Sequence, residues 1–364
     1  MDYMERAISL AKLALGQVSP NPAVGSVIVK DDKIIGQGYT QPPGSSHAEI
    51  MALKEAGEQA KGATMYVTLE PCCHYGRTPP CTQAIITAGI KEVHAAMLDP
   101  NPMVSGKGLK ELENAGIKIS NGKHTTDALE VVESYVKFIT TGRPFVTVKF
   151  AMSLDGKIAT KRGDSKWISG DESRRYVHFL RYTSDAIMVG VNTILIDDPQ
   201  LTARCGFRGG VTKKQPLRII VDSPGKTPLT ARVFSEPGNV LLAVSKKVSP
   251  TRKRAYTKAG AEVLVLPSKR GLIDLEELLL ILGKRQITSV LIEGGSTLLG
   301  SLCDQNLVDK MTVFIAPIII GGEKARTAIG GKGIDKVVNS LKLERIKTNQ
   351  FDNDLMITGY IGRK

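Results

Sequence analysis

Two spacings of apolar residues alternate along the first third of the chain and predict alternating helices and strands. Apolar side chains recur at helical spacing from Met4 to Leu15, and Gly16 can end that helix in a left-handed turn. Apolar runs at 24–29 and 34–38 flank a polar turn and predict a hairpin. Further strands are expected at 63–69 and 93–98, and helices at 47–57, 82–88 and 105–115. This alternation predicts an α/β domain with helices packed on the sheet.

A breaker segment, Thr141-Gly142-Arg143-Pro144, follows a helix predicted over 127–140. We therefore expect two domains, 1–141 and 142–364. The second opens with the apolar segment 145–150, and its later runs are rich in Val and Ile, as in strands buried on both faces. These runs predict a second α/β domain, with strands at 186–191, 217–222, 239–244, 262–266, 288–292 and 311–320.

Length and composition agree with two globular domains. The chain has 364 residues, and a domain takes roughly 150. Its 42% hydrophobic and 23% charged content excludes a disordered or fibrous protein. No apolar run reaches the roughly 18 residues of a membrane helix, and the N-terminus lacks a signal-peptide layout. We predict a cytoplasmic protein with no membrane partner.

The net charge of +13 is unevenly distributed. Residues 1–141 hold 13 basic and 15 acidic side chains, net −2, whereas residues 142–364 hold 36 and 21, net +15. An excess of this size first suggests a polyanion such as nucleic acid. Its restriction to the second domain is also compatible with small phosphorylated ligands, which would motivate part of it.

The first domain contains residues suited to zinc. Five cysteines are an odd number for a disulfide framework. His47-Ala48-Glu49 followed by Pro71-Cys72 has the order of a zinc nucleobase deaminase, H-x-E then P-C-x-x-C, which needs one His, two Cys and a carboxylate that is not a ligand. The second cysteine is displaced, because Cys81 lies nine positions after Cys72. Cys73 or His74 could therefore replace one ligand.

Glu49 lies at the start of the helix predicted at 47–57, and Cys81 lies directly before the helix predicted at 82–88. The positive end of a helix dipole favours a thiolate over a thiol, and zinc requires the thiolate. Zinc with three protein ligands lowers the pKa of bound water to about 7. Glu49 would take the water proton and pass it to the ring nitrogen and the departing ammonia. The alternative is structural: Ser46-His47-Ala48-Glu49 also matches a capping box, in which Glu49 only bonds to the backbone of Ser46.

Three segments, 47–49, 68–81 and 99–102, resemble the deaminase half of the bacterial bifunctional riboflavin biosynthesis deaminase/reductase family. The loop Pro71-Cys72-Cys73-His74-Tyr75-Gly76-Arg77-Thr78-Pro79-Pro80-Cys81 is specific to it. The resemblance implies a cytidine-deaminase-like three-layer domain, with Glu49 catalytic and Cys73 a bystander. Thr40 stands where the family has His. The implied Zn2+ ligands are His47, Cys72 and Cys81, and the implied substrate-binding residues are Asn21, His74, Arg77, Asp99 and Asn101.

The second domain contains neither a G-x-G-x-x-G nor a Walker A pattern. One segment, 290–298, predicts a strand, a glycine turn and a helix start, whose free N–H groups could hold a phosphate. A simple tight turn is the alternative.

Segments 149–157, 163–168, 197–204 and 293–295 are similar to the reductase half of the same family, which has a dihydrofolate-reductase-like α/β fold. Trp167, the only tryptophan, could instead be a core residue. Lys149 and Asp155 are candidates for polar assistance on position alone. The resemblance implies that NADPH is bound by Ala151, Trp167, Thr193, Asp197, Ser223, Gly294, Gly295 and Ser296. It implies that the substrate is bound by Ser165, Arg181, Leu201, Arg204 and Glu293.

The implied enzyme is a diaminohydroxyphosphoribosylaminopyrimidine deaminase and 5-amino-6-(5-phosphoribosylamino)uracil reductase. It would deaminate a diaminopyrimidine ribosyl phosphate with zinc and then reduce the ribosyl group to ribityl with NADPH. We expect a homo-oligomer that acts on small molecules and not on nucleic acid. A nucleic-acid deaminase is disfavoured because the first domain is net −2. A protein with one purely structural domain is disfavoured by motifs in both halves.

Overall fold

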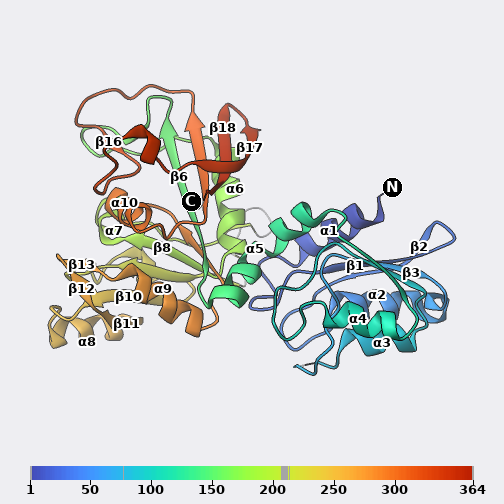
Figure 1. Ribbon diagram of the computed structural model, residues 1–364. Helices are drawn as coiled ribbons and strands as arrows, with labels where there is room; N and C mark the ends of the chain where they lie inside the picture. The colour runs from blue at the N-terminus through green and yellow to red at the C-terminus, as the bar shows by residue number, and fades with distance from the viewer. Residues whose placement is uncertain (1, 77, 206–211, 213, 363–364) are drawn as a thin grey trace. The chain divides into compact units, whose positions relative to one another are not determined.

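The computed structural model describes residues 2–76, 78–205, 212 and 214–362. It divides into two compact units, Met1–Arg143 (unit 1) and Pro144–Lys364 (unit 2) (Figure 1). The division lies within the predicted breaker segment, where Gly142 adopts a left-handed φ of 68° and ends the last helix of unit 1. Among the residues that the structure describes, no helix is both long and apolar enough to cross a membrane.

Unit 1 is built on a five-stranded sheet with the order β2-β1-β3-β4-β5. Strand β1 is antiparallel to β2 and β3, and β3, β4 and β5 are parallel. The strands are β1 (Gly25–Lys30), β2 (Lys33–Tyr39), β3 (Thr64–Val67), β4 (Glu92–Ala95) and β5 (Lys118–Asn121). The helices are α1 (Tyr3–Leu13), α2 (Ala48–Ala56), α3 (Cys81–Thr87), α4 (Lys107–Asn114) and α5 (Thr125–Thr141), with a short 3-10 turn at Gly57–Ala60.

Helices cover both faces of this sheet, so unit 1 has three layers (Figure 1). Successive side chains of β1 point to opposite faces of the sheet and so contribute to the cores on both sides. Val27 and Val29 point into a core shared with α1, whereas Ile28 points into a core shared with α2, α3 and α4. The two cores lie on opposite faces of the sheet, which gives the three-layer arrangement that the family resemblance implies.

Unit 2 has a nine-stranded sheet, ordered β11-β10-β9-β8-β14-β6-β15-β18-β17. Its strands are β6 (Phe145–Ser153), β8 (Ala186–Gly190), β9 (Leu217–Val221), β10 (Val240–Ser245), β11 (Ala261–Leu266), β14 (Ser289–Ile292), β15 (Lys310–Ala316), β17 (Leu343–Phe351) and β18 (Asp354–Ile361). Two small sheets pair β12 (Ser268–Lys269) with β13 (Leu272–Ile273) and β7 (Lys157–Ala159) with β16 (Arg326–Thr327). The helices are α6 (Asp171–Thr183), α7 (Val191–Asp197), α8 (Pro250–Lys258), α9 (Leu275–Lys284) and α10 (Ser296–Asp304), with 3-10 turns at Arg232–Phe234 and Val337–Asn339.

The central strands of this sheet are parallel and buried on both faces, as their Val-rich and Ile-rich sequences predict. One face packs on α9 and α10, and the other packs on α7 and α8. Strands β5, β17 and β18 of the two main sheets were not predicted, and neither were the short strands β7, β12, β13 and β16. Strand β17 is exposed along nearly all of its length and lies at the edge of the sheet, so its sequence carries no apolar pattern.

Candidate functional sites

A cluster of one histidine and two cysteines lies at the helix starts of unit 1. The Nδ1 atom of His47 is 3.3 Å from Sγ of Cys81 and 3.6 Å from Sγ of Cys72. The three donor atoms all lie within 4.8 Å of one another. These atoms suit tetrahedral zinc, which takes imidazole nitrogen and thiolate sulfur and leaves a fourth position open.

Two helix starts bring the cluster together. His47 is the N-cap residue of α2, and Cys81 is the first residue of α3. The backbone N–H of Cys81 donates to Sγ of Cys72 across 3.4 Å, which stabilises negative charge on that sulfur. The capping-box alternative is wrong, because the N-cap of α2 is His47 and not Ser46, and the His47 side chain makes no capping hydrogen bond. Glu49 is instead a buried residue in the first turn of α2, with 4% of its surface exposed.

The charges of this cluster perturb one another. A hydrogen bond from the Cys81 thiol and a second contact with His47 hold the pKa of Cys72 at about 4. The adjacent Cys72 thiolate and burial raise the pKa of Cys81. Burial, followed by the Cys72 thiolate, raises the pKa of Glu49 to about 7. A buried carboxyl with a pKa close to neutral is suited to accept and release protons.

The other ring nitrogen of His47 also has a partner. Oγ1 of Thr78 lies 3.4 Å from Nε2, which leaves Nδ1 directed at the two sulfurs. A hydrogen bond at the second nitrogen of a metal-binding histidine fixes the ring and its tautomer. Thr78 belongs to the loop that carries the family resemblance, but its side chain was not predicted to have a role.

The structure also defines the surroundings of the predicted pyrimidine-binding residues. Asp99 is buried, and Tyr135 on α5 donates to both of its carboxylate oxygens, at 2.9 and 3.2 Å. The backbone N–H of Asn101 donates to the same carboxylate at 2.8 Å. Burial raises the pKa of Asp99. Tyr135 was missed, because it is far from Asp99 in sequence and carries no motif.

The remaining predicted residues of unit 1 differ in their burial and in their hydrogen-bond partners. Nδ1 of His74 is buried with no hydrogen-bond partner within the described part of the chain, so a bound ligand could hydrogen-bond to it. Asn21 is half-buried and its backbone N–H donates to Val18. Thr40 is buried and its hydroxyl oxygen accepts from the backbone N–H of Val24. Arg77 lies outside the described residues.

In unit 2, several predicted residues follow neighbouring parallel strands at the same edge of the sheet. Strand β8 precedes Thr193, β9 precedes Ser223, and β14 precedes the turn that starts at Glu293. Ala151 lies on β6 beyond the last residue that pairs with β14, and its partner on the neighbouring strand is Phe314 of β15. The Ser223 carbonyl accepts from the side chain of Ser245 at 2.7 Å. The carboxyl edge of a parallel sheet is where open α/β sheets bind ligands.

The glycine turn after β14 has the predicted form. Strand β14 ends at Ile292 and α10 begins at Ser296. Gly294 and Gly295 have φ values of 135° and 88°, which side chains rarely tolerate. A Cβ atom at either glycine would lie 3.5 Å from the hydroxyl oxygen of Thr193. The turn is thus packed against α7, and its N–H groups at the start of α10 suit a phosphate.

A group of buried charges includes Glu293, the first residue of this turn. The guanidinium of Arg181 donates to both carboxylate oxygens of Glu293, at 2.5 and 2.8 Å, and also to the carbonyl of Thr202 at 3.0 Å. The two charged side chains are 13% and 6% exposed. Burial alone would raise the pKa of Glu293, but Arg181 and then Lys149 lower it below its ordinary value. Burial lowers the pKa of Lys149, against the effect of Glu293.

Arg204 is held by neighbours that were not predicted. Its guanidinium donates to the side-chain oxygen of Gln200 at 2.7 Å and lies 3.3 Å from Nε2 of His178. The other ring nitrogen of His178 faces the carbonyl of Thr202 at 3.1 Å. Burial, together with Arg181 and Arg204, lowers the pKa of His178 to about 4, so the ring is a neutral acceptor for Arg204.

Other predicted residues of unit 2 fall into small groups. Trp167 is 69% exposed, so its alternative role as a core residue is wrong. The hydroxyl of Ser165 donates to Asp197 at 3.1 Å, which brings a predicted substrate contact next to a predicted cofactor contact. Leu201 is buried with a left-handed φ of 55°, a strained conformation for a bulky residue and one that often marks functional sites.

Residues 144–357 match the family model of the RibD C-terminal domain, and residues 1–97 match that of the cytidine and deoxycytidylate deaminase zinc-binding region. The riboflavin biosynthesis protein RibD of Aquifex aeolicus is 45% identical to this chain, over 98% of it and 97% of that protein. The chain belongs to the RibD family. RibD of Escherichia coli K12 is 42% identical to it over 93% of each chain.

Solved structures of RibD proteins agree. One form of Acinetobacter baumannii RibD is 39% identical, with a TM-score of 0.87 over 99% of this chain and 98% of that one. A Thermotoga maritima protein described as a diaminohydroxyphosphoribosylaminopyrimidine deaminase and 5-amino-6-(5-phosphoribosylamino)uracil reductase has a TM-score of 0.85, with 37% identity over 99% and 98%. The family inferred from the motifs and the α/β class with an N-terminal deaminase-like domain are confirmed.

Proposed function

We propose that this RibD protein catalyses two consecutive reactions of riboflavin biosynthesis. Unit 1 removes an amino group from a diaminopyrimidine ribosyl phosphate by hydrolysis, and unit 2 then reduces the ribosyl group to ribityl with NADPH. The observation that carries the proposal is the cluster of His47, Cys72 and Cys81 beside the buried Glu49, in one chain with a RibD C-terminal domain.

In unit 1 we assign His47, Cys72 and Cys81 as the zinc ligands. When bound, zinc lowers the pKa of water to about 7 and so supplies a nucleophile at neutral pH. Glu49 would accept one proton from the attacking water and deliver it to the ring nitrogen. It would then accept the proton of the hydroxyl group formed on the ring carbon and deliver it to the amine, which leaves as ammonia. Asp99, Asn101, Asn21 and His74 hold the pyrimidine, and Arg77 holds the phosphate.

In unit 2 the glycine turn and the neighbouring strand ends would bind NADPH, through Ala151, Trp167, Thr193, Asp197, Ser223 and residues 294–296. The turn fits a dinucleotide phosphate because its two glycines leave the backbone open and its N–H groups begin a helix. NADPH, when bound, supplies the hydride for C1 of the ribose. Arg204 binds the phosphate of the substrate, and Ser165, Arg181, Leu201 and Glu293 complete its site.

Polar assistance to the reduction is a prediction for Lys149 and Asp155. Lys149 lies beside Glu293 and its pKa is lowered, which brings it closer to a group that can give up a proton. Asp155 already accepts from the backbone N–H groups of Ile320 and Gly321, at 3.0 and 2.8 Å, and from Ser153 at 2.6 Å. The bond from Ser153 and the two backbone bonds lower the pKa of Asp155 to about 2, and the two backbone bonds connect its carboxylate to residues 320–321.

The test supplies the diaminopyrimidine ribosyl phosphate to the zinc-loaded protein with and without NADPH. Ammonia release is expected without the cofactor, and NADPH oxidation is expected once the cofactor is added. Absence of ammonia would contradict the deaminase assignment. Ammonia release without later NADPH oxidation would contradict the reductase assignment alone.

The ligand assignment makes a separate prediction about the three neighbouring cysteines. Cys72→Ser and Cys81→Ser should each lose tightly bound zinc, because a serine hydroxyl is a poor substitute for a thiolate. Cys73→Ser is the matched control and should retain zinc, since Cys73 is outside the cluster. Metal content by mass spectrometry measures this. Zinc loss in Cys73→Ser would restore the alternative in which Cys73 is a ligand.

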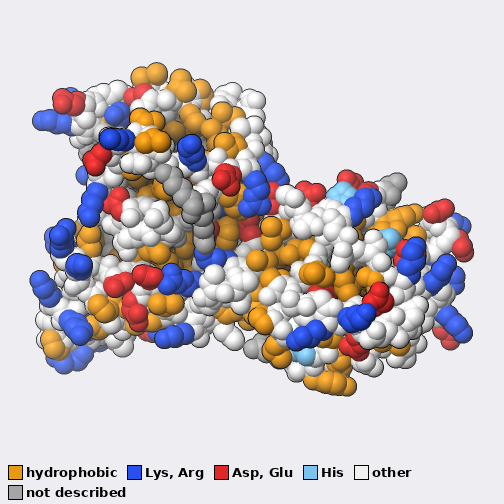
Figure 2. Space-filling view, viewed as in Figure 1, with side chains coloured by type: hydrophobic (Ala, Val, Ile, Leu, Met, Phe, Trp, Pro, Cys, Tyr) orange, Lys and Arg blue, Asp and Glu red, His pale blue; other side chains and the backbone are white. Residues whose placement is uncertain are grey.

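The charge pattern accords with small phosphorylated ligands. On the face of unit 2 shown in Figure 2, Lys and Arg side chains lie at scattered places with acidic side chains between them. A homo-oligomer and a cytoplasmic location stay predictions. Exposed apolar side chains support self-association, which sedimentation of the full chain would measure. They include Val337 and Val338 in the 3-10 turn that precedes β17 in sequence and Ile346 on β17 itself.

A further inference from the structure

A buried carboxylate in unit 1 has no part in the chemistry above. Glu70 is 3% exposed and accepts four hydrogen bonds from the backbone. Its Oε2 accepts from the N–H groups of Asp99 at 3.1 Å and Gly106 at 2.8 Å. Its Oε1 accepts from those of Gly108 at 2.9 Å and Leu109 at 3.2 Å. Both oxygens are therefore occupied by fixed donors.

These bonds join two parts of the deaminase site. Glu70 immediately precedes Pro71 and the zinc ligand Cys72, whereas Asp99 begins the loop that carries Asn101. A carboxylate between the two segments fixes the backbone of the substrate-binding loop relative to the metal-binding loop. Charge-assisted bonds from several N–H groups are strong in a buried site, where water does not compete.

The packing around Glu70 leaves little freedom. A Cβ atom at Gly108 would lie 2.1 Å from the carbonyl oxygen of Pro71 and 3.2 Å from Oε1 of Glu70. The start of α4 is thus in direct contact with the segment that leads to the zinc ligands. Only glycine permits this approach.

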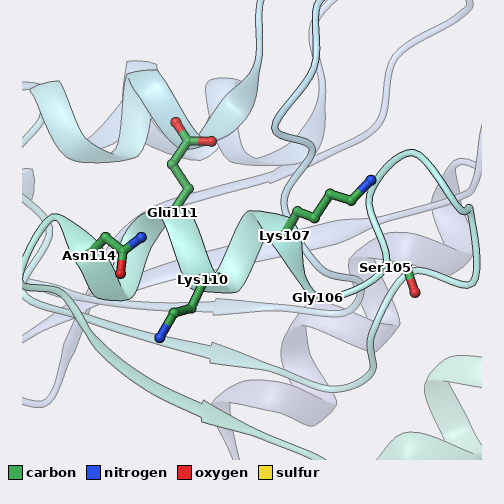
Figure 3. A pocket seen from close by; sticks show the side chains of 6 residues that line it. All are labelled: Ser105, Gly106, Lys107, Lys110, Glu111 and Asn114. Carbon is green, nitrogen blue, oxygen red and sulfur yellow. The ribbon is translucent and has the colours of Figure 1, made fainter.

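An exposed lysine also contacts the loop that begins at Asp99 and carries Asn101. An open hollow on α4 is lined by Ser105, Gly106, Lys107, Lys110, Glu111 and Asn114 (Figure 3). Nζ of Lys107 donates from there to the carbonyls of Pro102 and Met103, at 3.0 and 3.5 Å. This lysine is exposed, so water competes for its bonds, and the buried carboxylate contributes more to the position of the loop.

We propose that Glu70 is a positioning residue for deamination, which acts through Asp99 by fixing where this residue meets the pyrimidine relative to the zinc ligands. The proposal rests on the proposed function, in which Asp99 binds the substrate. Glu70 needs both oxygens for this role. Glutamine has the same shape, but its amide would direct an NH2 group at two N–H donors.

The test is a double-mutant cycle in the full zinc-loaded chain. Glu70→Gln should raise KM for the diaminopyrimidine ribosyl phosphate about tenfold and change kcat little. A tenfold change corresponds to about 1.4 kcal/mol, which is within the cost of leaving a buried donor unpaired. Asp99→Asn should also raise KM. In the Asp99→Asn background, Glu70→Gln should then add less than about twofold, because residues that act through one contact are not additive.

The controls separate positioning from general damage. Zinc content and NADPH oxidation with pre-deaminated substrate should be unchanged in Glu70→Gln. Glu113→Gln, the same substitution on the exposed side of α4, should leave KM unchanged. If Glu70→Gln does not fold, Glu70→Asp, which keeps the charge but withdraws it by one methylene group, enters the same cycle.

Additive effects of the two substitutions, or an unchanged KM, would overturn the proposal. Failure of the proposed function gives a different result, because the wild-type protein would then release no ammonia.

Discussion

Glu49→Gln is expected to reduce ammonia release by about 10²–10⁴-fold, the usual contribution of general acid–base catalysis. Glutamine matches the size of the buried glutamate and can still accept a hydrogen bond, but it cannot take a proton from water or return one to the ring. The loss should appear in kcat, since Glu49 is proposed to transfer protons during the reaction and not to bind the substrate. Steady-state ammonia release measures it.

Two controls make this result specific. Glu55→Gln, on the exposed side of the same helix, should retain full ammonia release. In Glu49→Gln itself, zinc content and NADPH oxidation with pre-deaminated substrate should remain at the wild-type level, because the reductase residues belong to unit 2. Ammonia release within a few-fold of wild type would mean that another group moves the proton.

The zinc site could be predicted from sequence because its residues come from two short segments. His47 and Glu49 share the first turn of α2, and Cys72 and Cys81 bracket one loop that ends at α3. The order of these residue types is a local signal. The sequence alone could not decide between Cys72 and Cys73, since adjacent residues differ only in the direction of their side chains.

The residues that support the sites were not predictable in the same way. Tyr135 reaches Asp99 from a distant helix, and His178 faces Arg204 from another. Glu70 is bound by backbone N–H groups, which every residue but proline carries and which leave no trace in sequence. Contacts of this kind depend on how the helices pack on the sheet.

The edge strands β5 and β17 were not predicted for a related reason. Buried strands such as β10 are marked by unbroken apolar runs. Strand β5 is largely exposed, and β17 has almost no buried face. Both lie at sheet edges, where a strand is defined by backbone pairing to one neighbour and its side chains are free to be polar.

Glu293→Gln is expected to destabilise unit 2 by about 3–5 kcal/mol, the cost of removing one partner from a buried ion pair. Arg181 would lose the charged carboxylate to which it donates two hydrogen bonds. Its guanidinium would stay charged, because it does not deprotonate in proteins. Lys149 would lose the same counter-charge, although a lysine can respond by deprotonating. NADPH oxidation should fall with stability, because Arg181 would no longer be held in place.

Hydrogen exchange measures this effect where it arises. Amides of β14, which leads directly to Glu293, and of β6, which pairs with β14, should exchange faster in Glu293→Gln, whereas those of β1 and β3 in unit 1 serve as an internal reference. The matched control is Glu262→Gln, which breaks an exposed bidentate pair with Arg285 and should cost less than about 1 kcal/mol. Unchanged exchange with a raised KM would mean that Glu293 serves the substrate alone. Faster exchange would mean that the pair also holds the carboxyl edge of the sheet together, so that the proposed reductase site and the stability of unit 2 depend on the same carboxylate.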